Sequence, residues 1–137
     1  QRQMCIRDRY MEAWIGLVRG GRATQQAYYV YDEMSQNSMI AQTPNMAPSL
    51  VGKAVAQAAQ DHLSNASGTL HEALALDPAN MLALANQAVA KSLDSETGVP
   101  EADAAANLYA TTEPTSALAL LWDSKRRELA EAIAALA

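Results

Sequence analysis

The chain has 137 residues, of which half are apolar and only 5% aromatic, and its formal net charge is −5. This length corresponds to a single domain. An acidic chain without a basic stripe is a poor partner for nucleic acid, because phosphate contacts need clustered lysine and arginine. No window approaches roughly eighteen uninterrupted apolar residues, so no segment is expected to span a membrane. Abundant alanine and the absence of phenylalanine favour an all-helical fold.

The first residues, Gln1–Arg9, read QRQMCIRDR and resemble translated sequencing adapter without apolar periodicity. We therefore expect residues 1–10 to be a non-native, disordered segment that takes no part in the fold. The segment holds three arginines and one aspartate, so leaving it out changes the formal net charge from −5 to −7. It also contains Cys5, the only cysteine, so the remaining chain cannot be a disulfide scaffold. Residues 11–137 are expected to be the C-terminal fragment of a longer solenoid, with a broken end exposed at Met11–Val18.

Apolar periodicity and helix-breaking residues predict a series of helices joined by turns. Glycine is favoured just past a helix C-terminus, so Gly20-Gly21 ends the first helix. Proline and asparagine mark a loop in Asn37–Ala47, and Asn80 is a plausible N-cap. The expected helices, in chain order, are Met11–Val18, Ala23–Ser35, Pro48–His62, one from Ala66 that Asp77-Pro78 ends, Met81–Leu93, Glu101–Ala110 and Ser116–Ala137, with a turn at Ser64 and Asn65.

One stretch has the spacing of a tetratricopeptide repeat, in which small residues let two antiparallel helices approach and large residues fill the gap. The positions are Leu50, Ala54, Ala66, Leu70, Ala73 and Pro78. Parts of the pattern recur in an earlier unit at Ala27, Tyr31 and Met34, and in a later unit at Leu84 and Ala88. The sequence therefore predicts an all-α fold: a right-handed α-solenoid of tetratricopeptide-like helical hairpins that ends in a long C-terminal helix.

Residues that could carry chemistry are few. His62 and His71, with Asp61 and Glu72 beside them, could be imagined as a metal site or an acid–base pair. They are better explained as polar positions of amphipathic helices. The basic run Lys125–Arg127 interleaves with acidic residues, which is typical of a solvated helix face. We expect no catalytic residue, no metal site and no cofactor.

The first helix of each unit in a two-helix solenoid also lines a concave groove. All the positions expected to face this groove are apolar, and we predict them to bind a partner: Val51, Val55, Leu82, Ala85, Val89 and Leu93. Polar residues of these helices occupy one narrow strip: Ser49, Lys53, Gln57 and Gln60, then Asn86, Gln87 and Lys91. A helix that is apolar nearly all round is normally buried on both sides. The groove should therefore be filled, either by another chain or by this chain's own C-terminal helix.

Several stretches together resemble the epsilon subunit of coatomer, the COPI vesicle coat. The matching residues are Trp14, Gly20-Gly21, Ala27-Tyr28-Tyr29, Gly52–Ala56, Glu72–Leu74 and Gly98–Glu101. The resemblance covers most of Trp14–Ala137. It departs from the family pattern in the longer insertion at Asn37–Ala47 and in the small residues at Ala104–Ala106.

The resemblance implies a non-enzymatic structural subunit that binds the C-terminal region of the coat's alpha subunit. It also implies a cytoplasmic protein held peripherally on Golgi membranes and COPI-coated vesicles, acting in Golgi-to-ER retrograde and intra-Golgi transport. The alternative from the residues alone is a generic tetratricopeptide adaptor that binds an apolar peptide or helix. Apolar residues such as Val51 and Val89 argue against the charged carboxylate clamp that some adaptors use. A small hydrolase would need His62 and His71 to share a pocket.

Overall fold

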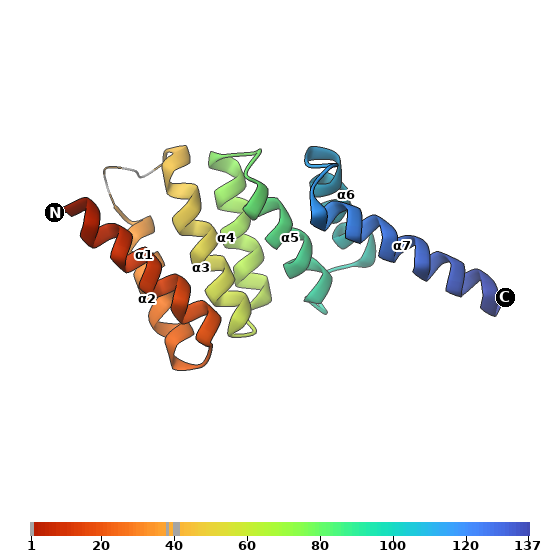
Figure 1. The fold of residues 1–137 in the computed structure, drawn as a ribbon, viewed down its shortest axis with the longest axis horizontal. Helices are drawn as coiled ribbons and strands as arrows, with labels where there is room; N and C mark the ends of the chain where they lie inside the picture. Colours follow the sequence, from red (N-terminus) through yellow and green to blue (C-terminus); the bar gives the residue numbers. More distant parts are fainter. Residues whose placement is uncertain (1, 38, 40–41) are drawn as a thin grey trace.

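The computed structural model describes residues 2–37, 39 and 42–137, and for residues 2–6 the backbone alone. The described residues form α-helices and one 3₁₀ turn that follow one another along a single axis, with the two termini at opposite ends (Figure 1). In chain order they are α1 (Arg2–Arg19), α2 (Arg22–Ser35), η1 (Pro44–Met46), α3 (Ala47–Ala59), α4 (Leu63–Leu76), α5 (Met81–Leu93), α6 (Val99–Thr112) and α7 (Ala117–Leu136). Each of the helices α1 to α6 packs against the next, which confirms the predicted all-α stack of helical hairpins. The right-handed sense stays a prediction.

Helix α5 has the predicted bounds because Asn80 caps it: the side-chain Oδ1 accepts a hydrogen bond from the backbone N–H of Ala83 at 3.0 Å. Ser116 does the same for α7, where its Oγ accepts from the N–H of Ala119 at 3.1 Å. In both cases a polar side chain precedes an apolar run, so the helix start is readable from the sequence.

The turn between α3 and α4 lies earlier than predicted. Helix α3 ends at Ala59 and α4 begins at Leu63, so the turn expected at Ser64 and Asn65 is wrong. Asp61 adopts a left-handed backbone (φ 64°), and the N–H of His62 bonds to the carbonyl of Gln57 at 2.9 Å. This is a Schellman ending, which usually uses glycine at the left-handed position. Because aspartate takes that position here, the sequence carries no glycine to mark the end of the helix.

The N-terminal segment differs from the disordered stretch expected over residues 1–10, since α1 begins at Arg2; Gln1 lies outside the described residues. The Arg9 guanidinium forms an ion pair with Glu33 of α2, and the Tyr10 hydroxyl lies 2.6 Å from Ser49 Oγ of α3. Arg9 and Tyr10 therefore take part in packing. A non-native origin for the residues before them stays a prediction.

The main core lies where α3, α4 and α5 meet, and small residues dominate it. Ala54, Ala66 and Ala73 are buried there beside Leu50 and Leu70, as the repeat spacing predicts. The alanines let the helix axes approach closely, and the leucines fill the space that remains between the helices.

Ala88 differs from the other small residues of the repeat, since it is half-buried and lines a hollow beside Tyr109. Ala106 and Tyr109 of α6 follow Leu70 and Ala73 of α4 by thirty-six residues instead of thirty-four, so a tyrosine stands where the previous unit has an alanine. The tyrosine ring and Ala88 line the same hollow between α5 and α6.

Candidate partner-binding groove

The first helices of the hairpins enclose an apolar hollow of about 470 Å³ between α1, α3 and α5. Tyr10, Trp14 and Val18 line it from α1, and Val51 and Val55 from α3. Leu82 and Asn86 of α5 and the buried ring of Tyr31 complete the wall. Burial raises the pKa of the Tyr31 hydroxyl above its ordinary value of 10.0, and the neighbouring Tyr10 raises it further, so the ring stays neutral.

A second hollow of about 160 Å³ lies where α5, α6 and α7 meet. Ala85, Val89 and Leu93 line it from α5, and Leu118 and Trp122 from α7. The indole Nε1 of Trp122 is buried and has no hydrogen-bond partner among the described residues.

The six residues predicted to bind a partner therefore fall into two sets. The structure brings Val51, Val55 and Leu82 together in the larger hollow, and Ala85, Val89 and Leu93 in the smaller one. Leu82, Val89 and Leu93 are 58%, 50% and 66% exposed, whereas Val51 is buried. Three large apolar side chains on one short helix thus face solvent, which is uncommon on a monomer surface unless something covers them.

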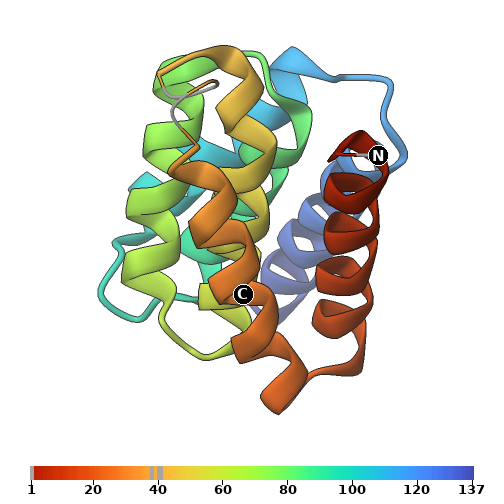
Figure 2. The ribbon, with the colours of Figure 1, turned by 90° about the vertical axis from the view of Figure 1, so that its left-hand side faces the viewer.

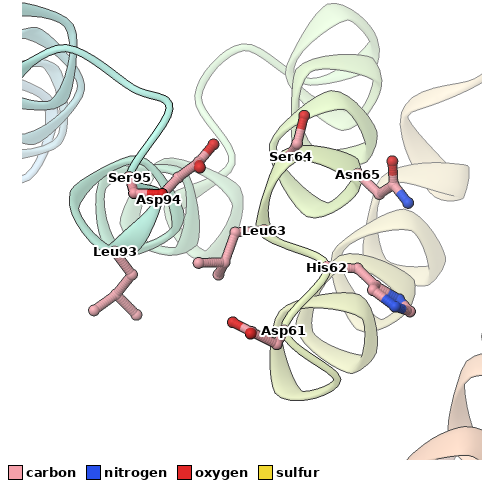
Figure 3. A pocket seen from close by; sticks show the side chains of 8 residues that line it. All are labelled: Asp61, His62, Leu63, Ser64, Asn65, Leu93, Asp94 and Ser95. Atoms are coloured by element: carbon pink, nitrogen blue, oxygen red, sulfur yellow. The ribbon is translucent and has the colours of Figure 1, made fainter.

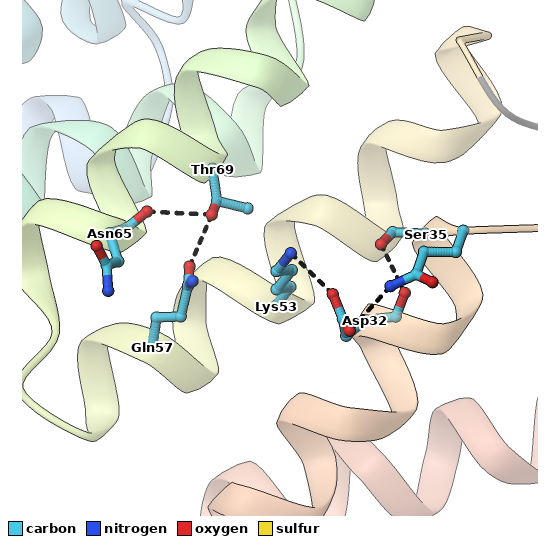
Figure 4. Close-up of polar contacts among 7 residues, drawn as sticks. Asp32, Ser35, Lys53, Gln57, Asn65 and Thr69 are labelled. Carbon is cyan, nitrogen blue, oxygen red and sulfur yellow. Dashed lines mark hydrogen bonds and ion pairs between the residues drawn. The ribbon is translucent and has the colours of Figure 1, made fainter.

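Two polar residues of α3, Lys53 and Gln57, bond to neighbouring helices (Figure 4), whereas Asn86 of α5 lines the larger hollow. The Nζ of Lys53 lies 2.8 Å from Asp32 of α2, and Gln57 accepts a hydrogen bond from Thr69 of α4 at 2.7 Å. Ser49 and Gln87, also in the predicted polar strip, are buried as well. Because these polar groups are used between helices, mainly apolar residues are left to line the groove.

The ammonium group of Lys53 is partly buried between α3 and α2, and Asp32 compensates its charge there. Partial burial lowers the pKa of its ammonium group, but the hydrogen bond and attraction from Asp32 outweigh this, so its pKa lies above the usual 10.5. The charge is neutralised on the side of α3 that faces α2. Among the described residues that line the two hollows, none carries a charge. The groove is therefore suited to an uncharged, apolar segment and not to a terminal carboxylate.

Sequence reasoning missed the contribution of α1 to the groove. Trp14 and Val18 are four residues apart, as are Val51 and Val55 in the next unit, and this shared spacing is the signal that could have found it. The prediction that Met11–Val18 is a broken solenoid end does not consider the side of this helix on which Trp14 and Val18 line the groove.

The C-terminal helix does not enter the hollow between α1, α3 and α5, but its first turns form one wall of the smaller hollow. Helix α7 contacts the stack through its first turns, near Ala119 and Trp122, and then points away from α1 and α3 (Figure 1). All residues from Asp123 to Ala137 are exposed.

His62 and His71 do not form a shared site. His62 occupies the N-cap position of α4 without a side-chain capping bond, and both histidines are exposed. His62, Asp61 and Asp94 line one open hollow, but the ring of His62 points away from Asp94 (Figure 3). Nine residues separate the two histidines, which along a helix corresponds to about 13 Å and half a turn of rotation. In the described part of the chain, no three His, Cys, Asp or Glu side chains gather as a metal site would require.

Comparison with known proteins adds a direct assignment. A family model described as coatomer epsilon subunit matches residues 9–130. The chain belongs to the coatomer epsilon subunit family. The match begins at Arg9, where the ion pair to Glu33 ties α1 to α2. A comparison with curated proteins gives no significant match.

Members of the coatomer epsilon family are structural subunits of the COPI coat, so the chain is a coat component of vesicle transport that associates with other coat subunits. Within the described residues, no helix combines the length and the apolar character that crossing a bilayer requires.

Proposed function

We propose that this coatomer epsilon chain is a non-enzymatic scaffold whose groove holds an apolar segment from the C-terminal region of the coat's alpha subunit. The observation that carries the proposal is the uncharged, solvent-facing lining of the two hollows along α5. Leu82, Val89 and Leu93 would be covered on binding, which removes apolar surface from water.

By stabilising the alpha subunit, the chain would contribute to Golgi-to-ER retrograde and intra-Golgi transport. It would be cytoplasmic and reach Golgi membranes and COPI-coated vesicles only through the coat. Family membership supports this assignment, and the lack of clustered lysine and arginine among the described residues of the groove speaks against nucleic acid as a partner.

The test is capture of the C-terminal region of the alpha subunit by wild type and by Val89→Asp. Val89 is half-exposed in the free chain, so folding should change little, whereas the complex would bury an unpaired carboxylate. An uncompensated buried charge costs about 3–5 kcal/mol, so capture should fall at least a hundredfold. Leu108→Asp is the matched control, because Leu108 is 55% exposed on α6 and lines neither hollow.

Circular dichroism of each variant separates binding from folding. Equal capture by wild type and Val89→Asp would refute the groove assignment. Loss of capture together with loss of helicity would show that Val89 supports the fold instead. Because Trp14 and Trp122 are the only tryptophans and line one hollow each, their emission should shift to shorter wavelength when the partner segment enters.

A further inference from the structure

The distal half of α7 has no apolar packing partner in the described chain, although Arg126 Nη1 donates a hydrogen bond to Asn107 Oδ1 of α6 at 2.7 Å. From Asp123 onward every residue is exposed, and α7 extends beyond the stack for several turns (Figure 1). A single helix of this length is marginal in water, since most helices in proteins are stabilised by packing one face against something.

This distal half carries one apolar face. Leu129, Ile133 and Leu136 are spaced by four and three residues, which places them on a common stripe, and they are 62%, 59% and 89% exposed. Glu131 is the only charged residue after Leu129. At about 100° per residue it lies nearly opposite this stripe, so no charge interrupts the apolar face from Leu129 to Leu136. Lys125 and Arg126 precede Leu129 by four and three residues and lie on the same side of the helix.

The charges of α7 argue against a membrane surface as its partner. Lys125, Arg126 and Arg127 are balanced within the helix by Asp123, Glu128 and Glu131. Arg127 and Asp123 pair at 2.7 Å, and Lys125 and Glu128 pair at 3.0 Å. A helix whose charges cancel, on a chain of net charge −5, has little attraction for anionic lipid.

The same molecule contains the complementary surface. The hollow between α1, α3 and α5 is apolar, uncharged and open, and Leu82 and Trp14 are 58% and 60% exposed at its rim. The two surfaces cannot meet within one chain, because α7 is attached at the far end of the stack and extends away from α1 (Figure 1). Seen along the stack from its N-terminal end, both helices lie on the same side of it (Figure 2). The two surfaces can meet between two chains.

We propose that, when no coat partner is bound, the distal half of α7 of one copy occupies the groove between α1, α3 and α5 of a second copy. Reciprocal exchange of α7 closes the assembly as a two-fold dimer. The inference rests on the proposed function only in that the same groove binds an apolar segment. It adds a regulatory consequence: self-association and capture of the alpha subunit exclude each other, so the partner converts the dimer into monomers.

Sedimentation of the full chain tests the proposal. Wild type at tens of micromolar should approach twice the chain mass of 14.7 kDa. Leu129→Lys with Ile133→Lys in α7, or Leu82→Lys in the groove, should each shift the dissociation constant at least tenfold, since a charge then enters an uncharged contact. Leu120→Lys is the matched control, because Leu120 is as exposed as Ile133 (both 59%) but lies on another side of α7.

Mixing the two defective variants is decisive. The groove of the α7 variant and the α7 of the groove variant are both intact, so an equimolar mixture should form a dimer with one working contact. A contact between two α7 helices predicts that Leu82→Lys still dimerises, and that result would overturn the proposal. Ile15 lines an outer hollow with Ala23 and Val30 at the N-terminal end of the stack. If the chains associate through this end instead, Ile15→Lys should abolish the dimer, and that result would also overturn the proposal.

Two further outcomes separate this inference from the function proposed above. A wild type that stays monomeric at high concentration, yet captures the alpha subunit, refutes the dimer and leaves the scaffold function in place. If the dimer forms as described, the α7 variant should capture the alpha subunit better than wild type, while Leu82→Lys should lose both activities. Unchanged capture by the α7 variant, alongside wild-type dimers, would show that the two events do not compete.

Discussion

Gly52 lies in the interior of α3, where glycine costs about 0.5–1 kcal/mol relative to alanine. A Cβ at this position would overlap the ring of Tyr31, which crosses from α2. Tyr31 is buried against Tyr10, with ring centroids 5.9 Å apart, so a shift of the ring away from α3 would disturb this contact. The glycine therefore permits the close approach of α2 and α3 that forms the floor of the groove.

Gly52→Ala should lower stability, because overpacking at a buried ring costs roughly 1–3 kcal/mol and exceeds the gain in helix propensity. Thermal unfolding followed by circular dichroism would measure the change. Gly68→Ala is the control: Gly68 lies in α4 with nothing within 4 Å of the added Cβ, so this variant should gain stability. Stabilisation by both substitutions would show that Tyr31 repacks freely.

Ala73 is fully buried in α4 at the centre of the core between α3, α4 and α5. Ala73→Leu should destabilise the chain by roughly 1–3 kcal/mol, since the helices cannot separate to admit the larger side chain. Ala75→Leu places the same side chain on an exposed position of the same helix and should have little effect. A melting temperature that barely moves in Ala73→Leu would contradict the repeat alignment.

At the level of the helices, the N-cap of α5 by Asn80 is the clearest single contribution to stability. Asn80 accepts from Ala83 N–H and donates from Nδ2 to Asp77 at 3.2 Å, which links α5 to the turn after α4. Asn80→Ala should lower the urea midpoint by the equivalent of about 1 kcal/mol. Asn80→Ser keeps an acceptor and should recover most of the loss. No difference between the two variants would mean that the cap contributes nothing.

How well the sequence predicts the bounds of a helix differs from one helix to the next. Asn80 and Ser116 predict the starts of α5 and α7, and the small residues of the repeat predict which faces meet. The end of α3 escapes prediction because Asp61 takes the left-handed position without glycine. Local chemistry is visible in a sequence, whereas a backbone conformation that an unusual residue adopts is not.

For the groove, sequence reasoning identifies the apolar side of α3 and α5 but not its division into two hollows. The smaller hollow is formed by side chains that α6 and α7 place beside α5, among them Tyr109 and Trp122, and α7 then leaves the stack. Both are tertiary effects that spacing rules for an ideal repeat do not contain. The partner-binding role of the six residues stays a prediction.

For the molecule as a whole, the same apolar residues would serve two competing contacts. Polar groups such as Lys53 and Gln57 join helices, and the described lining of the two hollows carries no charge. In both proposals above, a second chain covers this apolar lining: the alpha subunit in one, and another copy of the chain in the other.

The N-terminal segment offers a test of where the folded unit begins. Removing residues 1–8 should shorten α1 but leave the melting temperature nearly unchanged. Arg7 and Asp8 are exposed, as is the retained Arg9–Glu33 ion pair, and exposed pairs contribute about 0–1 kcal/mol.

Removing residues 1–10 also deletes Tyr10. Its hydroxyl is bonded to Ser49 Oγ at 2.6 Å, and Ser49 is fully buried, so the truncation would leave an unsatisfied hydroxyl and an opened edge beside Tyr31. The expected loss is about 1–3 kcal/mol, measured as a lower melting temperature than that of the shorter truncation. Tyr10→Phe in the full chain isolates the hydrogen bond from the ring. An equal fall in both truncations would mean that the first turns of α1 stabilise the fold in their own right.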